Sequence, residues 1–156
     1  MREIIYKILV FLGLINEKKE IIREETIYQK RNLMTNYEYK FYQNIKELED
    51  EYQIVPQLNL AAVTKKINNN RYYSELFRNI DFAIFSKDYQ ELLLLIEIND
   101  QTHNNYNRRD RDMKVKKICN DIGVKLITFY TKYPNEKTYV INRIKSELGT
   151  NKDINK

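Results

Sequence analysis

The stretch LLLLIEINDQTH, from Leu92 to His103, decides the fold of this chain. Its first five residues are large and aliphatic, which is typical of a strand in the interior of a sheet. The stretch then presents Glu97, Asn99, a second carboxylate and the only histidine of the chain within seven residues. Core packing does not require this group of polar side chains. We therefore expect the chemistry of the protein at the end of this strand.

The composition predicts one folded domain with a basic surface. The chain has 156 residues, of which 42% are hydrophobic and 31% charged, which suffices for a core of its own. The net charge of +5 is compatible with a polyanionic partner. The single cysteine, Cys119, excludes an internal disulfide and a cysteine-rich zinc site, and it fits a reducing compartment. We therefore expect a cytoplasmic protein. Nucleotide hydrolysis has no support, because the sequence lacks a glycine-rich phosphate loop.

Two segments precede the expected domain. Residues 1–16 are predicted to form a hydrophobic helix, because Ile4, Ile8 and Leu12 fall on one helical face. This apolar run is shorter than the roughly 20 residues that span a bilayer, and it lacks the cleavage site of a secretory signal. The helix suits docking on a core, on a partner or on the cytoplasmic side of a membrane. Residues 17–32 are rich in charge and are predicted to be a linker or a solvated helix.

The domain proper is predicted over residues 33–150, with a polar tail at 151–156. Thr35 and Glu38 match a capping box, so a helix is expected to begin there. The expected elements are a helix at 36–51, strands at 52–60, 79–85 and 92–99, a helix at 108–122, a strand at 124–130 and a helix at 139–148. Pro56 indicates either an edge position in the sheet or a strand end, and the second and third strands are expected to form a hairpin. This order predicts an α/β fold with a mixed sheet flanked by helices.

Two acidic residues lie inside predicted strands, where such residues are depleted. Asp81 is in the second strand and Glu97 is in the third. A hairpin brings the two carboxylates together, and they repel unless a cation lies between them. Oxygen ligands suit a hard divalent cation, Mg²⁺ or Mn²⁺, which activates water and neutralises a phosphodiester. For each residue alone, a salt bridge to a nearby lysine or arginine is the alternative.

The same residues resemble the signature of a known superfamily. Asp81 followed by Glu97-Ile98-Asn99 is similar to the Asp…(Asp/Glu)-x-Lys motif of the PD-(D/E)XK nucleases, which share the restriction-endonuclease-like fold. A longer pattern resembles an uncharacterised bacterial family of that fold, related to very-short-patch repair endonucleases. That pattern consists of Leu33 to Phe41, Val55 to Gln57, Asn79 to Phe82, Ile96 to His103, Arg111-Asp112, Lys116 and Gly123 to Ile127. The resemblance implies a restriction-endonuclease-like mixed sheet flanked by helices.

The resemblance also implies roles for individual residues. Asp81 would be the central metal ligand, Glu97 the second ligand, and the Ile98 carbonyl a neighbour in the coordination shell. Glu38 would be the acidic residue from the first helix, although its capping box with Thr35 explains it equally well. His103 would act as a general base or hold the attacked phosphate, since its ordinary pKa suits proton transfer near neutrality.

One position departs from the signature. Asn99 occupies the place of the signature's lysine, and an amide neither donates a proton as an acid nor carries a charge. The carbonyl oxygen of Asn99 can still coordinate a metal. Lys114 or Lys116 from the following helix is the candidate replacement. Otherwise the site is weakened or inactive.

The helix after the histidine is strongly basic. Its candidate nucleic-acid-binding residues are Arg108, Arg109, Arg111, Lys114 and Lys116. Such a run is typical of a solvated face, but beside a metal site it also fits a track for the phosphate backbone. Asp112 is a candidate for orienting His103 or Arg111, and Tyr72, Tyr73 and Tyr106 are candidates for stacking on bases.

Together these features predict a metal-dependent endonuclease that cleaves nucleic acid, with DNA as the expected substrate. An alternative is a nuclease-fold module that has lost activity through Asn99 and binds nucleic acid or a protein partner. A third hypothesis is a membrane-tethered protein that uses the domain for partner contacts.

Overall fold

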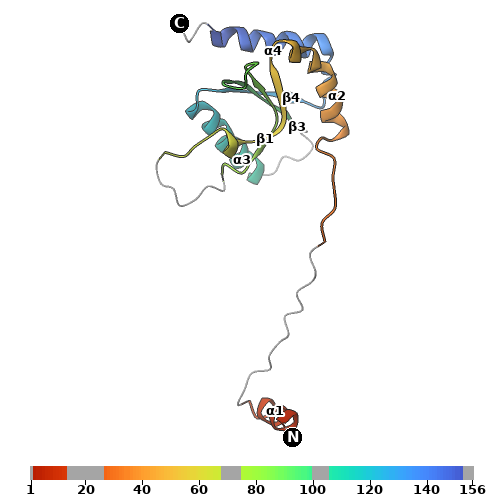
Figure 1. Cartoon of the computed structure of the whole chain (residues 1–156), viewed down its shortest axis with the longest axis vertical. Coiled ribbons are helices and arrows are strands. Elements are labelled where there is room, and N and C mark those ends of the chain that lie inside the picture. The colour runs from red at the N-terminus through yellow and green to blue at the C-terminus, as the bar shows by residue number, and fades with distance from the viewer. Residues whose placement is uncertain (1, 14–26, 68–74, 100–105, 153–156) are drawn as a thin grey trace. The chain divides into compact units, whose positions relative to one another are not determined.

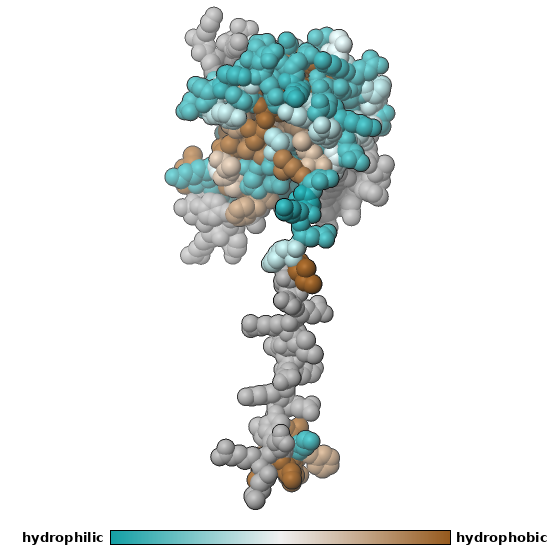
Figure 2. Space-filling view, turned by 45° about the vertical axis from the view of Figure 1, so that its right-hand side comes forward, coloured by the Kyte–Doolittle hydropathy of each residue, from teal (hydrophilic) through white to brown (hydrophobic). Residues whose placement is uncertain are grey.

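The computed structural model describes residues 2–13, 27–67, 75–99 and 106–152, apart from the side chains of a few helix-end residues. The chain divides into two compact units, Met1–Arg31 and Asn32–Lys156. The first unit contains helix α1 (Arg2–Phe11), on which apolar side chains are visible in Figure 2. Ile4, Ile5 and Ile8 are among its exposed residues. No helix in the described part of the chain is both long and apolar enough to cross a membrane.

The second unit is built on a sheet of four strands in the order β1-β2-β3-β4. These strands are β1 (Gln53–Asn59), β2 (Asn79–Phe85), β3 (Leu92–Asn99) and β4 (Lys125–Tyr130). The β1–β2 and β2–β3 pairs are antiparallel, whereas β4 runs parallel to β3. The predicted hairpin is confirmed. Pro56 lies in an edge strand, which is the first of the two positions that the sequence left open. The mixed α/β architecture is also confirmed.

Helices cover both faces of this sheet (Figure 1). Helices α2 (Asn36–Ile45) and α4 (Lys137–Lys152) pack on one face through a core that includes Phe41, Phe82, Ile96 and Ile144. Helix α3 (Tyr106–Asp121) connects β3 to β4 and covers the other face. Its residues Val115 and Cys119 pack with Ala83 and Leu95 of the strands. We refer to these surfaces as the α2/α4 face and the α3 face.

Two predicted helix ends of the second unit differ from the structure by more than two residues. The helix predicted over 36–51 ends at Ile45, and a 3-10 helix, η1 (Lys46–Asp50), follows it. Leu48 is the one apolar residue among the charged residues of η1, and the tighter turn buries it. The last helix extends to Lys152, into the segment predicted as a polar tail. A short 3-10 helix, η2 (Leu60–Ala62), follows β1.

Candidate functional site

The register of the sheet places Asp81 opposite Glu97. In the antiparallel β2–β3 pair, Phe82 is the partner of Ile96 and Ala83 is the partner of Leu95. The next step along both strands leads to Asp81 and Glu97. The negative charge of Asp81 raises the pKa of Glu97, so the two carboxylates lie near each other. The predicted approach of the two carboxylates thus follows from the hairpin.

The same row continues onto the two outer strands. Pro56 pairs with Phe82 and Leu58 pairs with Ile80, so the intervening Gln57 stands opposite Asp81. On the other side, Glu97 pairs with Thr128 of β4. Four strands thus contribute to one row across the sheet, which consists of Gln57, Asp81, Glu97 and Thr128.

Glu97 faces α3. Side chains alternate along a strand, so Glu97 lies on the same face as Leu95, which belongs to the core beneath α3. Residues of α3 also act electrostatically on Glu97. The alternation does not hold at Asp81, because Ile80 packs beneath α3 whereas Phe82 packs beneath α2 and α4. Asp81 instead contacts Glu38 of α2 and the Ile98 amide.

Asp81 is half-buried and held by the backbone of the next strand. The Ile98 amide donates a hydrogen bond of 2.6 Å to Asp81 Oδ2. Burial raises the pKa of Asp81 to about 6, the Ile98 bond opposes this rise, and the nearby Glu38 carboxylate adds to it. Asp81 is therefore fixed in orientation but costly to ionise in the absence of a cation.

Glu97 is also half-buried. Burial, together with the negative charges of Asp81 and Asp112, raises its pKa to about 7. Arg111 and Lys116 act in the opposite direction. Two carboxylates in this state favour either a shared proton or a bound cation.

Glu38 caps helix α2 and also contacts Gln57 and Asp81. Its Oε2 accepts a 2.6 Å hydrogen bond from the Thr35 amide, while the Glu38 amide donates to Thr35 Oγ1 at 3.2 Å. Its Oε1 accepts a 3.3 Å bond from Gln57 Nε2, and the side chain is hydrogen-bonded to Asp81. The two roles that the sequence left open for Glu38 are thus compatible, because each of its oxygens faces a different partner.

Gln57 is a site residue that sequence reasoning missed. Its φ of 53° lies in the left-handed region, which is uncommon for a residue other than glycine and strained inside a strand. This conformation accompanies the bond that links Gln57 to Glu38. The available signal was its place in Val55-Pro56-Gln57, a segment of the resemblance, but nothing local indicated a polar contact with the first helix.

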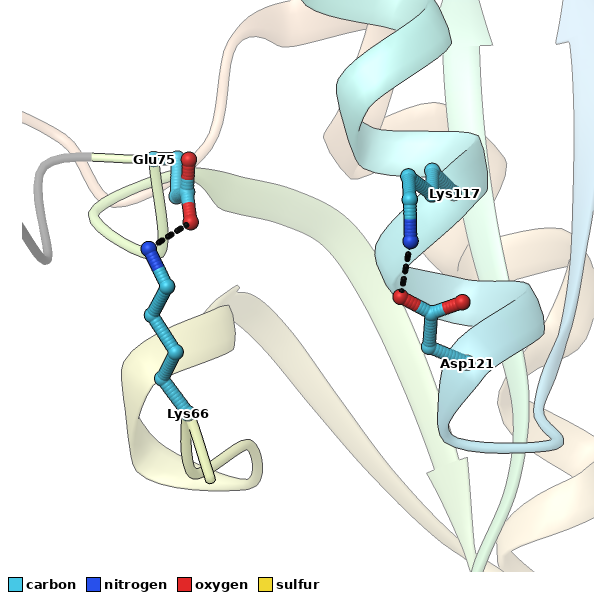
Figure 3. Close-up of polar contacts among 4 residues, drawn as sticks. All are labelled: Lys66, Glu75, Lys117 and Asp121. Carbon is cyan, nitrogen blue, oxygen red and sulfur yellow. Dashed lines mark hydrogen bonds and ion pairs between the residues drawn. The ribbon is translucent and has the colours of Figure 1, made fainter. Parts of the chain in front are cut away.

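The basic residues of α3 are not equivalent. Lys114 pairs with Asp110 at 2.7 Å, and Lys117 pairs with Asp121 at 2.5 Å. Figure 3 shows the Lys117–Asp121 pair on α3, and a similar pair between Lys66 and Glu75 nearby. Both pairs on α3 join residues four apart on the helix.

Lys116 is better placed than Lys114 to act at the acidic pair. It is exposed, forms no ion pair with any residue in the described part of the chain, and acts electrostatically on Glu97. Arg111 also acts electrostatically on Glu97, but it forms an ion pair with Asp112, whose oxygen lies 3.9 Å from the Arg111 Nε. Of the two lysines that sequence reasoning offered in place of Asn99, the geometry favours Lys116.

Comparison with known proteins gives one match that covers most of the chain. Residues 30–149 match the family model described as "Protein of unknown function (DUF2726)". The chain belongs to the DUF2726 family. The matched segment contains all four strands and the helices α2 and α3. No curated protein and no solved structure matches the chain.

Some predicted site residues of this DUF2726 protein lie outside the described residues. They include His103, Tyr72 and Tyr73, and most of the predicted linker at 17–32. Arg108 and Arg109 are in the first turn of α3, but the description covers only their backbone, as it does for Tyr106. Asn99 ends β3, and its backbone carbonyl accepts a 3.1 Å hydrogen bond from the Thr131 amide.

The donor set of the candidate site fits Mg²⁺. Within the described ranges, no three histidine, cysteine, aspartate or glutamate side chains are grouped closely enough to hold a metal by themselves. Mg²⁺ is usually held by one or two carboxylates, with water and substrate phosphates as the other ligands. Asp81, Glu97 and the Ile98 carbonyl offer such a set.

Cys119 is a buried residue of α3 near Glu97. Burial raises the pKa of Cys119 to about 11, so its thiol stays protonated.

Proposed function

We propose that this protein is a divalent-metal-dependent endonuclease with a restriction-endonuclease-like domain, which hydrolyses phosphodiester bonds in DNA. The observation that carries the proposal is the pair of half-buried carboxylates, Asp81 and Glu97, which lie on adjacent strands and act on each other electrostatically. Their raised pKa values indicate that the site favours an added positive charge. The resemblance to the PD-(D/E)XK signature and the mixed sheet with its β3–α3–β4 unit give the same interpretation.

Each group of this site has a distinct task in the proposed reaction. Asp81 and Glu97 hold Mg²⁺ together with the Ile98 carbonyl, and the Ile98 amide keeps Asp81 oriented. When bound, Mg²⁺ lowers the pKa of water and neutralises charge on the phosphate. Glu38 and Gln57 position Asp81 from the side of β1.

The basic groups of α3 face the substrate in this scheme. Arg111 can bind a phosphate through two parallel hydrogen bonds. Lys116 supplies the charge that the signature's lysine would provide and that Asn99 lacks. His103 is proposed to accept the proton of the attacking water or to hold the attacked phosphate. Arg108 and Arg109 are proposed to contact the phosphate backbone.

Cleavage assays test the proposal. Supercoiled plasmid and single-stranded DNA are incubated with Mg²⁺ or Mn²⁺ and with wild type, Asp81→Asn or Glu97→Gln. Wild type should cleave, EDTA should stop it, and both variants should lose at least about 100-fold in rate, because each removes a metal ligand. Glu91→Gln is the matched control, since Glu91 is exposed and lies just before β3. Equal behaviour of wild type and both site variants would contradict the proposal.

A second candidate function rests on Asn99. If loss of the signature's lysine has disabled catalysis, the domain binds nucleic acid or a protein partner without cleaving. In that case wild type binds oligonucleotides in Mg²⁺ without cleaving them, and Asn99→Lys restores cleavage. An active wild-type enzyme would exclude this alternative.

A further inference from the structure

A pocket lies along the open edge of the sheet, beside β4. Its volume is about 540 Å³, which is within the range of roughly 300–1,000 Å³ that is usual for small-ligand sites. β4 is the last strand in the sheet order, so no further strand covers it within the described residues. The pocket is lined by Thr128, Phe129, Tyr130, Tyr133, Pro134, Asn135, Glu136, Tyr139 and Arg143.

The lining combines aromatic rings with one cation, Arg143. Tyr133 and Tyr139 are 55% and 54% exposed, so their rings are accessible to a ligand. The Arg143 guanidinium lies 4.7 Å from the centre of the Phe129 ring. It donates to the Thr128 carbonyl at 3.2 Å and to the Tyr139 hydroxyl at 3.4 Å. A planar ligand with a π face could thus stack on rings whose positions are already fixed.

Two further cationic side chains, Lys132 and Lys40, lie beside the pocket. Lys132 lies over the rings of Tyr133 and Tyr130, at 4.9 and 5.8 Å from their centres. An adjoining pocket of about 340 Å³ shares Tyr133, Pro134 and Asn135 and includes Lys40. The one carboxylate among the residues that line the two pockets is Glu136. This excess of positive charge complements a phosphate chain that enters and leaves the pocket.

The loop between the two pockets is held in place by hydrogen bonds. Asn135 Nδ2 donates to the Tyr37 hydroxyl at 2.7 Å and to the Tyr130 carbonyl at 3.0 Å. The Asn135 carbonyl accepts a 3.1 Å bond from Asn44 Nδ2. The pocket is therefore preformed, which lowers the entropic cost of binding.

The pocket adjoins β4, the strand next to the one that carries Glu97. Thr128, which lines the pocket, is the sheet partner of Glu97. Phe129 and Tyr139 place the pocket on the α4 side of β4, whereas Glu97 faces α3, so the path between them passes around the open edge of the sheet. We propose that this pocket binds one unstacked base of single-stranded DNA, whose sugar–phosphate chain continues around this edge to the acidic pair. This inference rests on the proposed function and specifies its substrate class. Bases in an intact duplex are stacked and paired, so a pocket of this kind accepts a base only outside the stack.

Binding without cleavage separates this proposal from the nuclease proposal. Fluorescence anisotropy is measured with Ca²⁺ in place of Mg²⁺, using the full chain and two labelled probes of equal length. One probe is oligothymidylate, and the other is the same sugar–phosphate chain without bases. Wild type should bind oligothymidylate more tightly, because only that probe has a base to stack.

Tyr139→Ala tests the pocket, with Tyr39→Ala as its matched control. Both tyrosines are on helices and both are 54% exposed, but Tyr39 lines neither pocket. Tyr139→Ala should weaken oligothymidylate binding about 5- to 100-fold and leave binding of the base-free probe unchanged. Tyr133→Leu, which keeps an apolar side chain but removes the ring, should give the same selective loss. Tyr39→Ala should bind both probes like wild type.

Three results would overturn the inference: equal binding of both probes by wild type, equal loss for both probes in Tyr139→Ala, or wild-type affinity in both pocket variants. None of them bears on whether Glu97→Gln stops cleavage. The converse result is also distinguishable. If wild type prefers oligothymidylate through Tyr139 but cleaves no DNA, the base pocket is supported and the nuclease proposal is contradicted.

Discussion

The two faces of the sheet are built from the same strands but differ in how their cores end. On the α2/α4 face, alternate residues such as Phe82, Ile84, Leu94 and Ile96 form a continuous apolar layer. On the α3 face, the apolar layer that includes Leu95 continues into Glu97, which lies near the carboxylate of Asp81. The first pattern stabilises the fold, whereas the second places repelling carboxylates where an apolar pair would be more stable.

This difference identifies the acidic pair as the place where the domain loses some folding stability. Carboxylates whose pKa values are raised by burial reduce stability at neutral pH unless something compensates. Active sites commonly show such a conflict between stability and function. Ile96 and Glu97 are adjacent on β3 and point to opposite faces, so substitutions at these two positions should have effects of opposite sign.

The largest effect is expected from Ile96→Ala, which should destabilise the domain by about 2–5 kcal/mol. Ile96 is completely buried in the α2/α4 core, and its removal leaves a cavity among close-packed side chains. Urea unfolding followed by circular dichroism measures the change. A loss below about 1 kcal/mol would show that this face is less tightly packed than its burial indicates.

The next effect is expected from Glu97→Gln, which should stabilise the metal-free protein at pH 8. The pKa of Glu97 is raised from 4.5 to about 7, so the folded state binds a proton more tightly than the unfolded state. This group therefore contributes stability that is fully present below about pH 4.5 and is lost as the pH rises through 7. Glutamine removes that loss, which amounts to roughly 1–3 kcal/mol.

The measurement is unfolding free energy against pH in EDTA, for wild type, Glu97→Gln and the control Glu91→Gln. Wild-type stability should fall between pH 4.5 and 7, and the fall should be smaller in Glu97→Gln, with the contribution of Asp81 remaining. Mg²⁺ should stabilise wild type at pH 8 and should have little effect on Glu97→Gln. A wild-type stability that rises over this range, or a Mg²⁺ effect that survives the substitution, would contradict the cation site.

The sequence predicted those parts of the site that depend on local patterns. The apolar runs around Asp81 and Glu97 define two strands, and a short hairpin fixes their register, so the facing of the pair follows. The capping box at Thr35 is equally local, and it is confirmed. Gln57 could not be found in this way, because its partner Glu38 is on a different element and its positive φ depends on the folded sheet.

The lysines of α3 and the tyrosines of the edge pocket show two further limits of prediction from the sequence. The pairing of Asp110 with Lys114 joins residues four apart on a helix, so the sequence contained a reason to favour Lys116 over Lys114. The edge pocket gave no comparable signal. The chain has 13 tyrosines, and Tyr133 and Tyr139 line one cavity only because β4 and α4 bring them together.

A smaller effect, on rate rather than on fold, is expected from Lys116→Gln. Lys116 acts on Glu97, whereas Lys114 is paired with Asp110, so the two lysines of α3 form a matched pair of positions. Lys116→Gln should lower the rate of DNA cleavage about 10- to 100-fold, because it removes a charge that faces the phosphate. Lys114→Gln should change it less than threefold. Equal losses would indicate that both lysines serve only as a general phosphate track.

The smallest effect on stability is expected from deleting residues 1–31. The core clusters lie entirely within the second unit, Asn32–Lys156, so the Tm of the truncated chain should match that of the full chain within about 2 °C.

Membrane binding, rather than stability, should decrease on truncation if α1 places its exposed Ile4, Ile5 and Ile8 on a lipid surface. Co-sedimentation with vesicles that contain anionic lipid measures this, with Ile5→Glu as the matched variant in the full chain. Equal sedimentation of all three proteins would remove the proposed membrane contact, and a large drop in Tm on truncation would show that the first unit contributes to the folded domain.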